Sequence, residues 1–240
     1  MQPTDTSPPL KEKGINIIQG IVGALLYVGR EVNKKLLVEL SAICAQQAAA
    51  TEDTAAEIEQ LLDYVAKYPN DGILFRKSDV ILAAHADVGI LNESRARSRA
   101  GVHLFHSENE LKPKLNGPVL KIAQIINTVM ASAAEAEFAA LFITAKKMIP
   151  LTHTLIEMGW PQPQKPIQTY NSTAVGFTNK KIVNKATKSS DMKLWWIRDR
   201  ESQEQFRYYW APGYENEGDY STKHHPPIYH EAKRAKTYLV

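Results

Sequence analysis

The chain has 240 residues, of which 44% are hydrophobic and 23% charged, and its formal net charge at pH 7 is +3. These are ordinary values for a globular protein with a real core, and the mild positive charge permits nucleic-acid binding without demanding it. The single cysteine, Cys44, excludes a disulfide framework, so we expect an intracellular, reducing compartment.

The N-terminal region predicts a tail followed by a helix. We expect residues 1–13, which contain proline, threonine and lysine, to be disordered. The next run, residues 15–28, is the most apolar of the chain, but Asn16 and Gln19 interrupt it. It is also shorter than the roughly 20 apolar residues that cross a bilayer. We therefore predict a core helix and no membrane span.

Residues 15–68 predict two or three helices. Apolar residues recur at helical spacing within residues 36–44 and again within residues 58–65. Thr54 and Glu57 have the spacing of a capping box at the start of the second stripe.

A turn and three strands are predicted next. Residues 69–72, Pro-Asn-Asp-Gly, indicate a turn, and a short strand is expected at residues 73–75. The apolar run 80–87 predicts a buried strand that ends at an acid, Asp87. Residues 99–105 and 119–126 predict two further strands, and Asn116-Gly117 between them is a hairpin-turn signal.

The remaining segments predict alternating helices and strands. A helix is expected over residues 132–148 and again over 150–158, with a break or kink at Pro150. The later predictions are a strand at 167–170, a short capped helix from 171–174, a helix at 190–200, an aromatic strand at 206–210 and a last helical segment from 218–223.

Four motifs occur in the same order as in copia-type retrotransposon Pol polyproteins and resemble them. Residues 132–141 resemble the Ser-Ser-Thr-Glu-Ala-Glu-Tyr run whose second glutamate corresponds to Glu137. Residues 169–174 resemble Cys-Asp-Asn-x-x-Ala, and residues 188–198 resemble Lys-His-Ile-Asp-Ile…Ile-Arg. Residues 218–223 resemble Ala-Asp-x-Leu-Thr-Lys. All four motifs belong to the ribonuclease H domain of that family.

The helical region extends the resemblance. Residues 23–28 and 61–65 resemble the thumb or connection at the end of the family's reverse transcriptase. The polymerase palm with its paired aspartates has no counterpart, so the resemblance implies no DNA synthesis by this chain.

The resemblance implies an α/β fold of the ribonuclease H class, with a five-stranded mixed sheet and helices on both faces. We expect this domain over residues 76–225, after a helical thumb-like or connection segment at residues 14–75. Residues 226–240 are expected to form a C-terminal tail.

The resemblance also implies a candidate metal site. Ribonuclease H hydrolysis uses two Mg²⁺ ions held by carboxylates. The implied ligands are Asp87, Glu137 and Asp219, although each could instead be a solvated surface acid.

Position 170 departs from the family pattern. The family's fourth carboxylate is an aspartate, whereas this chain has Tyr170, and a neutral phenol is a poor ligand for Mg²⁺. Neither Asn171, on the opposite side of the strand, nor Glu135, on another helix face, is a substitute. We therefore expect cleavage of RNA–DNA hybrids to be absent or very weak.

Basic residues near aromatic ones suggest a surface that binds nucleic acid. Such residues grip phosphates and stack bases, but the same pattern also fits a solvated basic face over an aromatic core. The candidate basic residues are Arg97, Arg99, Lys180, Lys181, Lys185 and Lys188.

Two functional hypotheses remain open on the sequence. One is a catalytically impaired relative that serves as a structural or interaction subunit, with protein partners in a larger assembly. The other is a ribonuclease H domain that binds RNA–DNA hybrid and retains weak, Mg²⁺-dependent activity.

Overall fold

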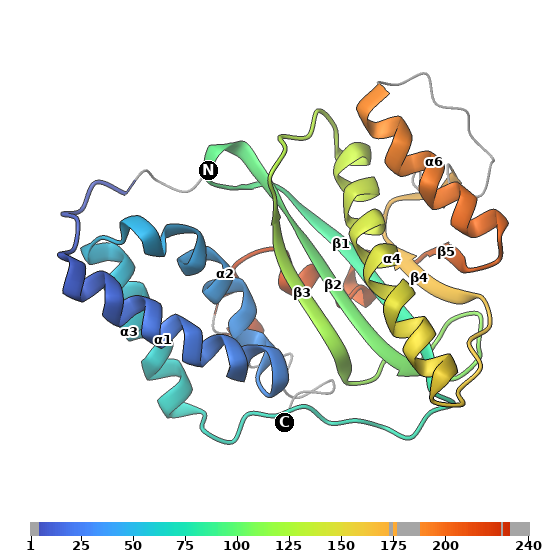
Figure 1. Ribbon diagram of the computed structural model, residues 1–240, viewed down its shortest axis with the longest axis horizontal. Helices are drawn as coiled ribbons and strands as arrows, with labels where there is room; N and C mark the ends of the chain where they lie inside the picture. The colour runs from blue at the N-terminus through green and yellow to red at the C-terminus, as the bar shows by residue number, and fades with distance from the viewer. Residues whose placement is uncertain (1–4, 173–174, 177–187, 227, 231–240) are drawn as a thin grey trace. The chain divides into compact units, whose positions relative to one another are not determined.

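The computed structural model describes residues 5–172, 175–176, 188–226 and 228–230, with the side chains of residues 188–191 excepted. The chain divides into two compact units (Figure 1). One contains the described residues up to Leu74 together with those from His224, and the other runs from Phe75 to Lys223.

The described part of the first unit is helical. Its α-helices are α1 (Glu12–Glu31), α2 (Leu37–Gln46) and α3 (Glu52–Lys67), joined by the 3₁₀ turns η1 (Lys34–Leu36) and η2 (Gln47–Ala49). Each α-helix turns apolar side chains inward, because these recur every three or four residues. The buried residues of this core are Ile18, Val22, Leu25, Leu36, Leu40, Ile43, Ala50, Ile58 and Leu61.

Three predictions for the N-terminal region are wrong. The N-cap of α3 is Thr51, whose hydroxyl accepts from the Thr54 N–H, while the Thr54 hydroxyl accepts from the Thr51 N–H. The capping box therefore lies three residues earlier than Thr54–Glu57. Residues 5–13 are not a free tail either, since Leu10 donates its N–H to the Ala50 carbonyl and α1 begins within this stretch. A strand at residues 73–75 is also absent from the described elements.

The second unit contains a five-stranded mixed sheet in the order β3-β2-β1-β4-β5. The strands are β1 (Ile81–Glu93), β2 (Arg97–Ser107), β3 (Pro118–Ile126), β4 (Lys165–Thr169) and β5 (Phe206–Trp210). β1, β2 and β3 pair antiparallel, whereas β4 and β5 pair parallel. β4 is also parallel to β1. This is the ribonuclease H-like fold that the sequence predicts.

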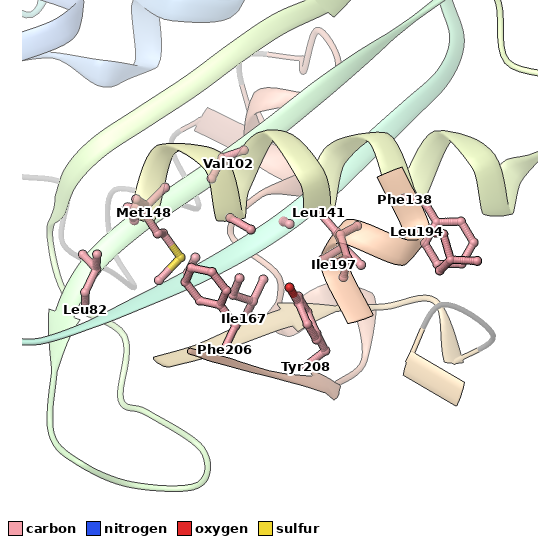
Figure 2. Packing of buried hydrophobic residues seen from close by; sticks show 14 of the residues in the cluster. Leu82, Val102, Phe138, Leu141, Met148, Ile167, Leu194, Ile197, Phe206 and Tyr208 are labelled. Carbon is pink, nitrogen blue, oxygen red and sulfur yellow. The ribbon is translucent and has the colours of Figure 1, made fainter. Parts of the chain in front are cut away.

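Two long helices cover one face of the sheet. α4 (Ala133–Glu157) lies across β1 and β2, and α6 (Lys188–Ser202) packs beside it (Figure 1). Figure 2 shows Met148 of α4 near Ile167 and Phe206 of the sheet, and Phe138 farther along the helix near Leu194 of α6. The helix predicted to break at Pro150 continues to Glu157, and the Thr154 hydroxyl donates to the Pro150 carbonyl.

The opposite face is covered by the chain that follows β5. This segment contains two 3₁₀ turns, η4 (Gly213–Glu215) and η5 (Asp219–Ser221). The predicted last helical segment is thus a single 3₁₀ turn. The short helix expected after residue 171 is described only in part, where the Val175 N–H donates to the Asn171 carbonyl.

β1 is longer than predicted. It continues six residues beyond Asp87 to Glu93, where a register shift leads into the connection to β2. Glu93 and Arg99 form an ion pair of 2.6 Å there, and both side chains are buried. The sequence prediction ended the strand where the apolar run ends, at Asp87. It therefore missed the last part of β1, which ends at the charged Glu93.

The connection between β2 and β3 is not a two-residue hairpin. It occupies residues 108–117, and Asn116 stabilises its end. The Asn116 side chain accepts from the Arg76 N–H at 2.7 Å and donates to the Arg76 and His106 carbonyls. Asn116 therefore serves as a side-chain bridge between segments.

Among the described residues, no helix combines the length and hydropathy needed to cross a membrane.

Candidate functional site

The candidate acids come from three separate elements: Asp87 from β1, Glu137 from α4 and Asp219 from η5. Close backbone packing brings η5 to the sheet. Gly101 of β2 pairs with Asp87, and a side chain at Gly101 would clash with the Gly218 carbonyl. A Cβ on Gly218 would lie 2.9 Å from the Asp87 nitrogen. These glycines therefore let the segment with Asp219 lie against the strand with Asp87.

Asp87 is buried in the middle of β1 and points away from the α4 core. Burial and the charge of Asp219 raise the pKa of Asp87 to about 6. Hydrogen bonds from the Thr222 side chain and the Val88 backbone, together with the charge of Lys223, oppose that rise. The carboxyl of Asp87 therefore titrates just below neutral pH.

Glu137 is completely buried on the first turns of α4. The hydroxyl of Thr169, at the end of β4, donates to Glu137 Oε2 at 3.1 Å. Burial and the nearby Asp87 raise the pKa of Glu137 to about 8. Burial and the charge of Asp87 thus favour the neutral form of this carboxyl group.

Asp219 is held by a cation from its own segment. Lys223 Nζ lies 2.7 Å from Asp219 Oδ1. The same lysine also lowers the pKa of Asp87. An ammonium group therefore already provides positive charge beside these two acids.

Tyr170 directly follows β4 and lies among these acids. Burial and the charges of Glu137 and Asp87 raise the pKa of its phenol, which stays neutral. Its backbone carbonyl accepts from Trp210 Nε1 at 2.7 Å, which ties the residue to the end of β5. The structure thus brings together the positions that the sequence singled out, with a phenol at the fourth.

These residues do not fit the pair of Mg²⁺ ions that the fold family implies. Tyr170 replaces one of the four expected carboxylates, and Asp219 already has an ion-pair partner in Lys223. Across the part of the chain that the structure describes, no group of three or more His, Cys, Asp or Glu side chains is arranged to hold a metal. These acids can bind and exchange protons. The arrangement supports no metal-dependent hydrolysis step.

The residues predicted to bind nucleic acid differ in their exposure and contacts. Arg97 is partly exposed and donates to the carbonyl and hydroxyl of Ser94. Arg99 is fully buried against Glu93, so its prediction as a phosphate-binding residue is wrong. Lys180, Lys181 and Lys185 lie outside the described residues, as does the side chain of Lys188.

Sequence reasoning missed several side chains of this site. Thr169, Thr222 and Lys223 each contact one of the acids or shift its pKa. All three lie within the motifs at residues 169–174 and 218–223. Their position in these motifs is the sequence feature that could have identified them as part of the site. The sequence also did not separate Trp195, which is 62% exposed with Arg198 over its ring, from Trp196, which packs against Phe142.

The sequence is similar to a retrovirus-related Pol polyprotein from transposon TNT 1-94 of Nicotiana tabacum. The two are 25% identical over 166 residues, which is 69% of this chain and 12% of that protein. The chain therefore spans a small part of this relative's length. No family model matches the chain.

Two solved structures resemble it at low similarity. LC11-RNase H1, isolated from compost, has a TM-score of 0.46 and 13% identity, covering 60% of this chain and 93% of that one. The foamy viral protease-reverse transcriptase in complex with dsDNA has a TM-score of 0.45 and 13% identity, covering 88% of this chain and 40% of that one. The fold assignment itself rests on the strand order of the sheet.

Proposed function

We propose that this chain, which has a ribonuclease H-like fold and is similar in sequence to part of a retrotransposon Pol polyprotein, is a catalytically impaired relative. We further propose that it acts as a structural or interaction subunit of a larger assembly.

One observation carries the proposal of impaired catalysis. The phenol of Tyr170 lies where Asp87, Glu137 and Asp219 raise its pKa, so it stays neutral and offers no anionic ligand at that position. Two-metal hydrolysis needs ligands that neutralise both ions and orient them. With Tyr170 at the fourth position and Asp219 paired with Lys223, the site supplies less carboxylate charge than four free acids would.

Exposed apolar side chains support the interaction role. On α6, Met192 is 77% exposed and Trp195 is 62% exposed. They are three residues apart, so they lie on the same side of the helix. Apolar surface of this kind is typical of positions that a binding partner covers.

The second candidate function is RNA–DNA hybrid binding with weak residual hydrolysis that uses Mg²⁺. The convergence of the three acids favours it, as does the stacking of Arg198 over Trp195 at 4.9 Å. A related fold, LC11-RNase H1, has a structure in complex with RNA/DNA hybrid. An arginine over an exposed tryptophan can stack on bases.

The deciding experiment incubates the full chain with a labelled RNA–DNA hybrid and Mg²⁺ or Mn²⁺. We expect no cleavage above that of Asp87→Asn, which removes one acid of the site. Cleavage by the natural sequence that disappears in Asp87→Asn would overturn the proposal and establish the second candidate. Binding to uncleaved hybrid is measured in the same samples, and a steep loss with added salt would identify phosphate contacts.

The interaction role has its own test. Tagged full chain is purified from its cells under native conditions, and the complex is analysed by mass spectrometry. We expect defined, stoichiometric partners whose recovery falls in Trp195→Ala and is unchanged in Trp160→Ala, since Trp160 is an exposed tryptophan outside α6. A chain that elutes alone in both forms would contradict the role.

A further inference from the structure

One side of α1 carries an exposed stripe of residues that recur alternately every four and every three positions. This is the spacing of a coiled-coil seam, which stays on one side of a helix. Two of its members are large and apolar: Ile17 is 54% exposed and Tyr27 is 71% exposed. The stripe lies opposite the side of α1 that buries Ile18, Val22 and Leu25 in the core of the first unit. This stripe, the α1 seam, consists of six exposed residues: Lys13, Ile17, Gly20, Ala24, Tyr27 and Glu31.

Two glycines on this side of α1 have no packing reason within the described part of the chain. A Cβ on Gly20, in the seam, or on Gly23, beside it, would meet no described atom within 4 Å. By contrast, a Cβ on Gly29, on the core side, would lie 3.0 Å from a methyl carbon of Leu40. Glycine destabilises a helix interior relative to alanine, and it suits places where another backbone approaches closely. Gly20 and Gly23 therefore favour a close neighbour that the described residues do not supply.

The sizes of the seam residues match a second copy of the seam. When two α1 helices pack antiparallel about a twofold axis at the middle of the seam, Gly20 faces the partner's Ala24, and Ile17 faces the partner's Tyr27. Small residues then meet at the centre, where the helix axes come closest, and large apolar residues meet on both sides of it. Size alone does not fix the direction, because a parallel pair also sets each residue against its own kind.

Charge selects the antiparallel direction. Lys13 and Glu31 lie at the two ends of the seam, and both are exposed. In an antiparallel pair Lys13 faces the partner's Glu31, and the twofold axis makes this opposite-charge contact twice. In a parallel pair each of them faces its own counterpart, and like charges repel. The charge pattern of the seam therefore complements a second copy of the same helix.

We propose that the α1 seam is a self-association surface at which two copies of this chain pair through antiparallel α1 helices. A helix of 20 residues is about 30 Å long, so one helix from each copy makes a small interface. Interfaces that bury less than about 1,200 Å² are typically weak. The dissociation constant is therefore expected in the micromolar range. The seam is separate from the exposed residues of α6, and the inference does not rest on the proposed function.

Sedimentation velocity of the full chain over a series of concentrations tests the pairing. We expect a monomer–dimer equilibrium in the natural sequence. Gly20→Arg puts a long charged side chain at the closest approach of the helices, while the open space around Gly20 accommodates it in the monomer. This variant should dimerise at least tenfold more weakly. Gln19→Arg adds the same side chain at an exposed position of α1 outside the seam, and it should leave the dissociation constant unchanged.

Charge reversal tests the direction of the pair. Lys13→Glu and Glu31→Lys each set like charges opposite one another across the axis, and each should weaken the dimer about fivefold. The double variant restores opposite charges and should restore the natural affinity. Both changes suit the helix, since acids are favourable in its first turn and bases in its last. Lys13→Glu is the cleaner single variant, because Glu31 also interacts electrostatically with the buried Lys34.

Three results would overturn the inference: only monomer up to submillimolar concentration, a dimer that Gly20→Arg does not weaken, or a double variant as weak as the single ones. The first would leave the α1 seam to a different partner, the second would place the dimer contact elsewhere, and the third would exclude the antiparallel direction. Circular dichroism checks the helix content of each variant. If Gly20→Arg loses helix, the charge-reversal set decides alone. Neither hybrid cleavage nor capture of other proteins enters this test, so its outcome is independent of the proposed function.

Discussion

The hydroxyl of Thr169, at the end of β4, donates a hydrogen bond to Glu137 Oε2 on α4 at 3.1 Å, and both side chains are fully buried. This contact joins the sheet to the helix that covers it. It places a carboxyl group in an environment that favours its neutral form, and the first prediction follows from that.

Replacing Glu137 by Gln should make stability less dependent on pH. The pKa of Glu137 is about 8 in the folded chain against an ordinary 4.5, so the folded state binds the proton more tightly than the unfolded chain. The stability from this group is fully present below pH 4.5 and is lost as pH rises through 8, at about 1.4 kcal/mol for each pKa unit of difference. Relative to the natural sequence, Glu137→Gln should therefore gain stability between pH 5 and pH 8.

Urea unfolding at a series of pH values measures this difference. Glu157→Gln, at the exposed last residue of α4, is the matched control and should follow the natural sequence. Parallel pH curves for the natural sequence and Glu137→Gln would show that Glu137 is ionised when folded.

Replacing Asp219 by Asn should lower the pKa of Asp87. The charge of Asp219 is the second cause of its rise to about 6, after burial. In Asp219→Asn the pKa should fall but stay above 3.8, the ordinary value, because burial remains. NMR titration of the Asp87 carboxyl carbon measures it, with Glu215→Gln as a control from the same segment. An unchanged value would mean that the two carboxyls do not interact.

Replacing Tyr170 by Asp should create Mg²⁺ binding that the natural sequence lacks. The substitution adds a carboxylate beside Asp87 and Glu137, and bound Mg²⁺ would favour their ionised forms. Ligand binding to the folded state raises the unfolding temperature, so Mg²⁺ should stabilise Tyr170→Asp only.

Thermal unfolding with and without Mg²⁺ tests this expectation. Tyr170→Asn is the control, since it has the same size as the aspartate without its charge. Equal stabilisation of the natural sequence would show that the acids hold Mg²⁺ despite the phenol. If Mg²⁺ does not stabilise Tyr170→Asp either, residues other than Tyr170 also prevent Mg²⁺ binding. Lys223, which pairs with Asp219, is then the first residue to examine.

Replacing Glu93 by Gln should strongly destabilise the second unit. It leaves the fully buried guanidinium of Arg99 without its 2.6 Å partner. Breaking a buried pair by removing one partner typically costs about 3–5 kcal/mol. Glu108→Gln, which breaks the more exposed 3.4 Å pair with Arg76, should cost less than about 1 kcal/mol. Chemical denaturation compares the two, and similar losses would contradict the burial of the Glu93–Arg99 pair.

Replacing Thr51 by Ala should destabilise α3 by about 1 kcal/mol, because it removes the N-cap hydroxyl. Glu57→Ala, at the position of the capping box expected from sequence, should have a smaller effect because Glu57 lies inside the helix. Calorimetry of both variants decides between the two cap positions. A larger loss in Glu57→Ala would restore the position expected from the sequence.

The sequence by itself determined the order of the elements and where the acids would lie along them. Apolar spacing identifies α4 and the strands and places Asp87 at the end of the run 80–87, and the motifs mark Glu137, Tyr170 and Asp219. These are local properties of the chain, and a local pattern is enough to reveal them.

The tertiary structure decided what each of those side chains can do. Burial of Glu137 beside Asp87 and the burial of Arg99 against Glu93 depend on contacts between elements and on removal from water. Charge state follows from solvation and neighbouring charges, and these are properties of the folded chain.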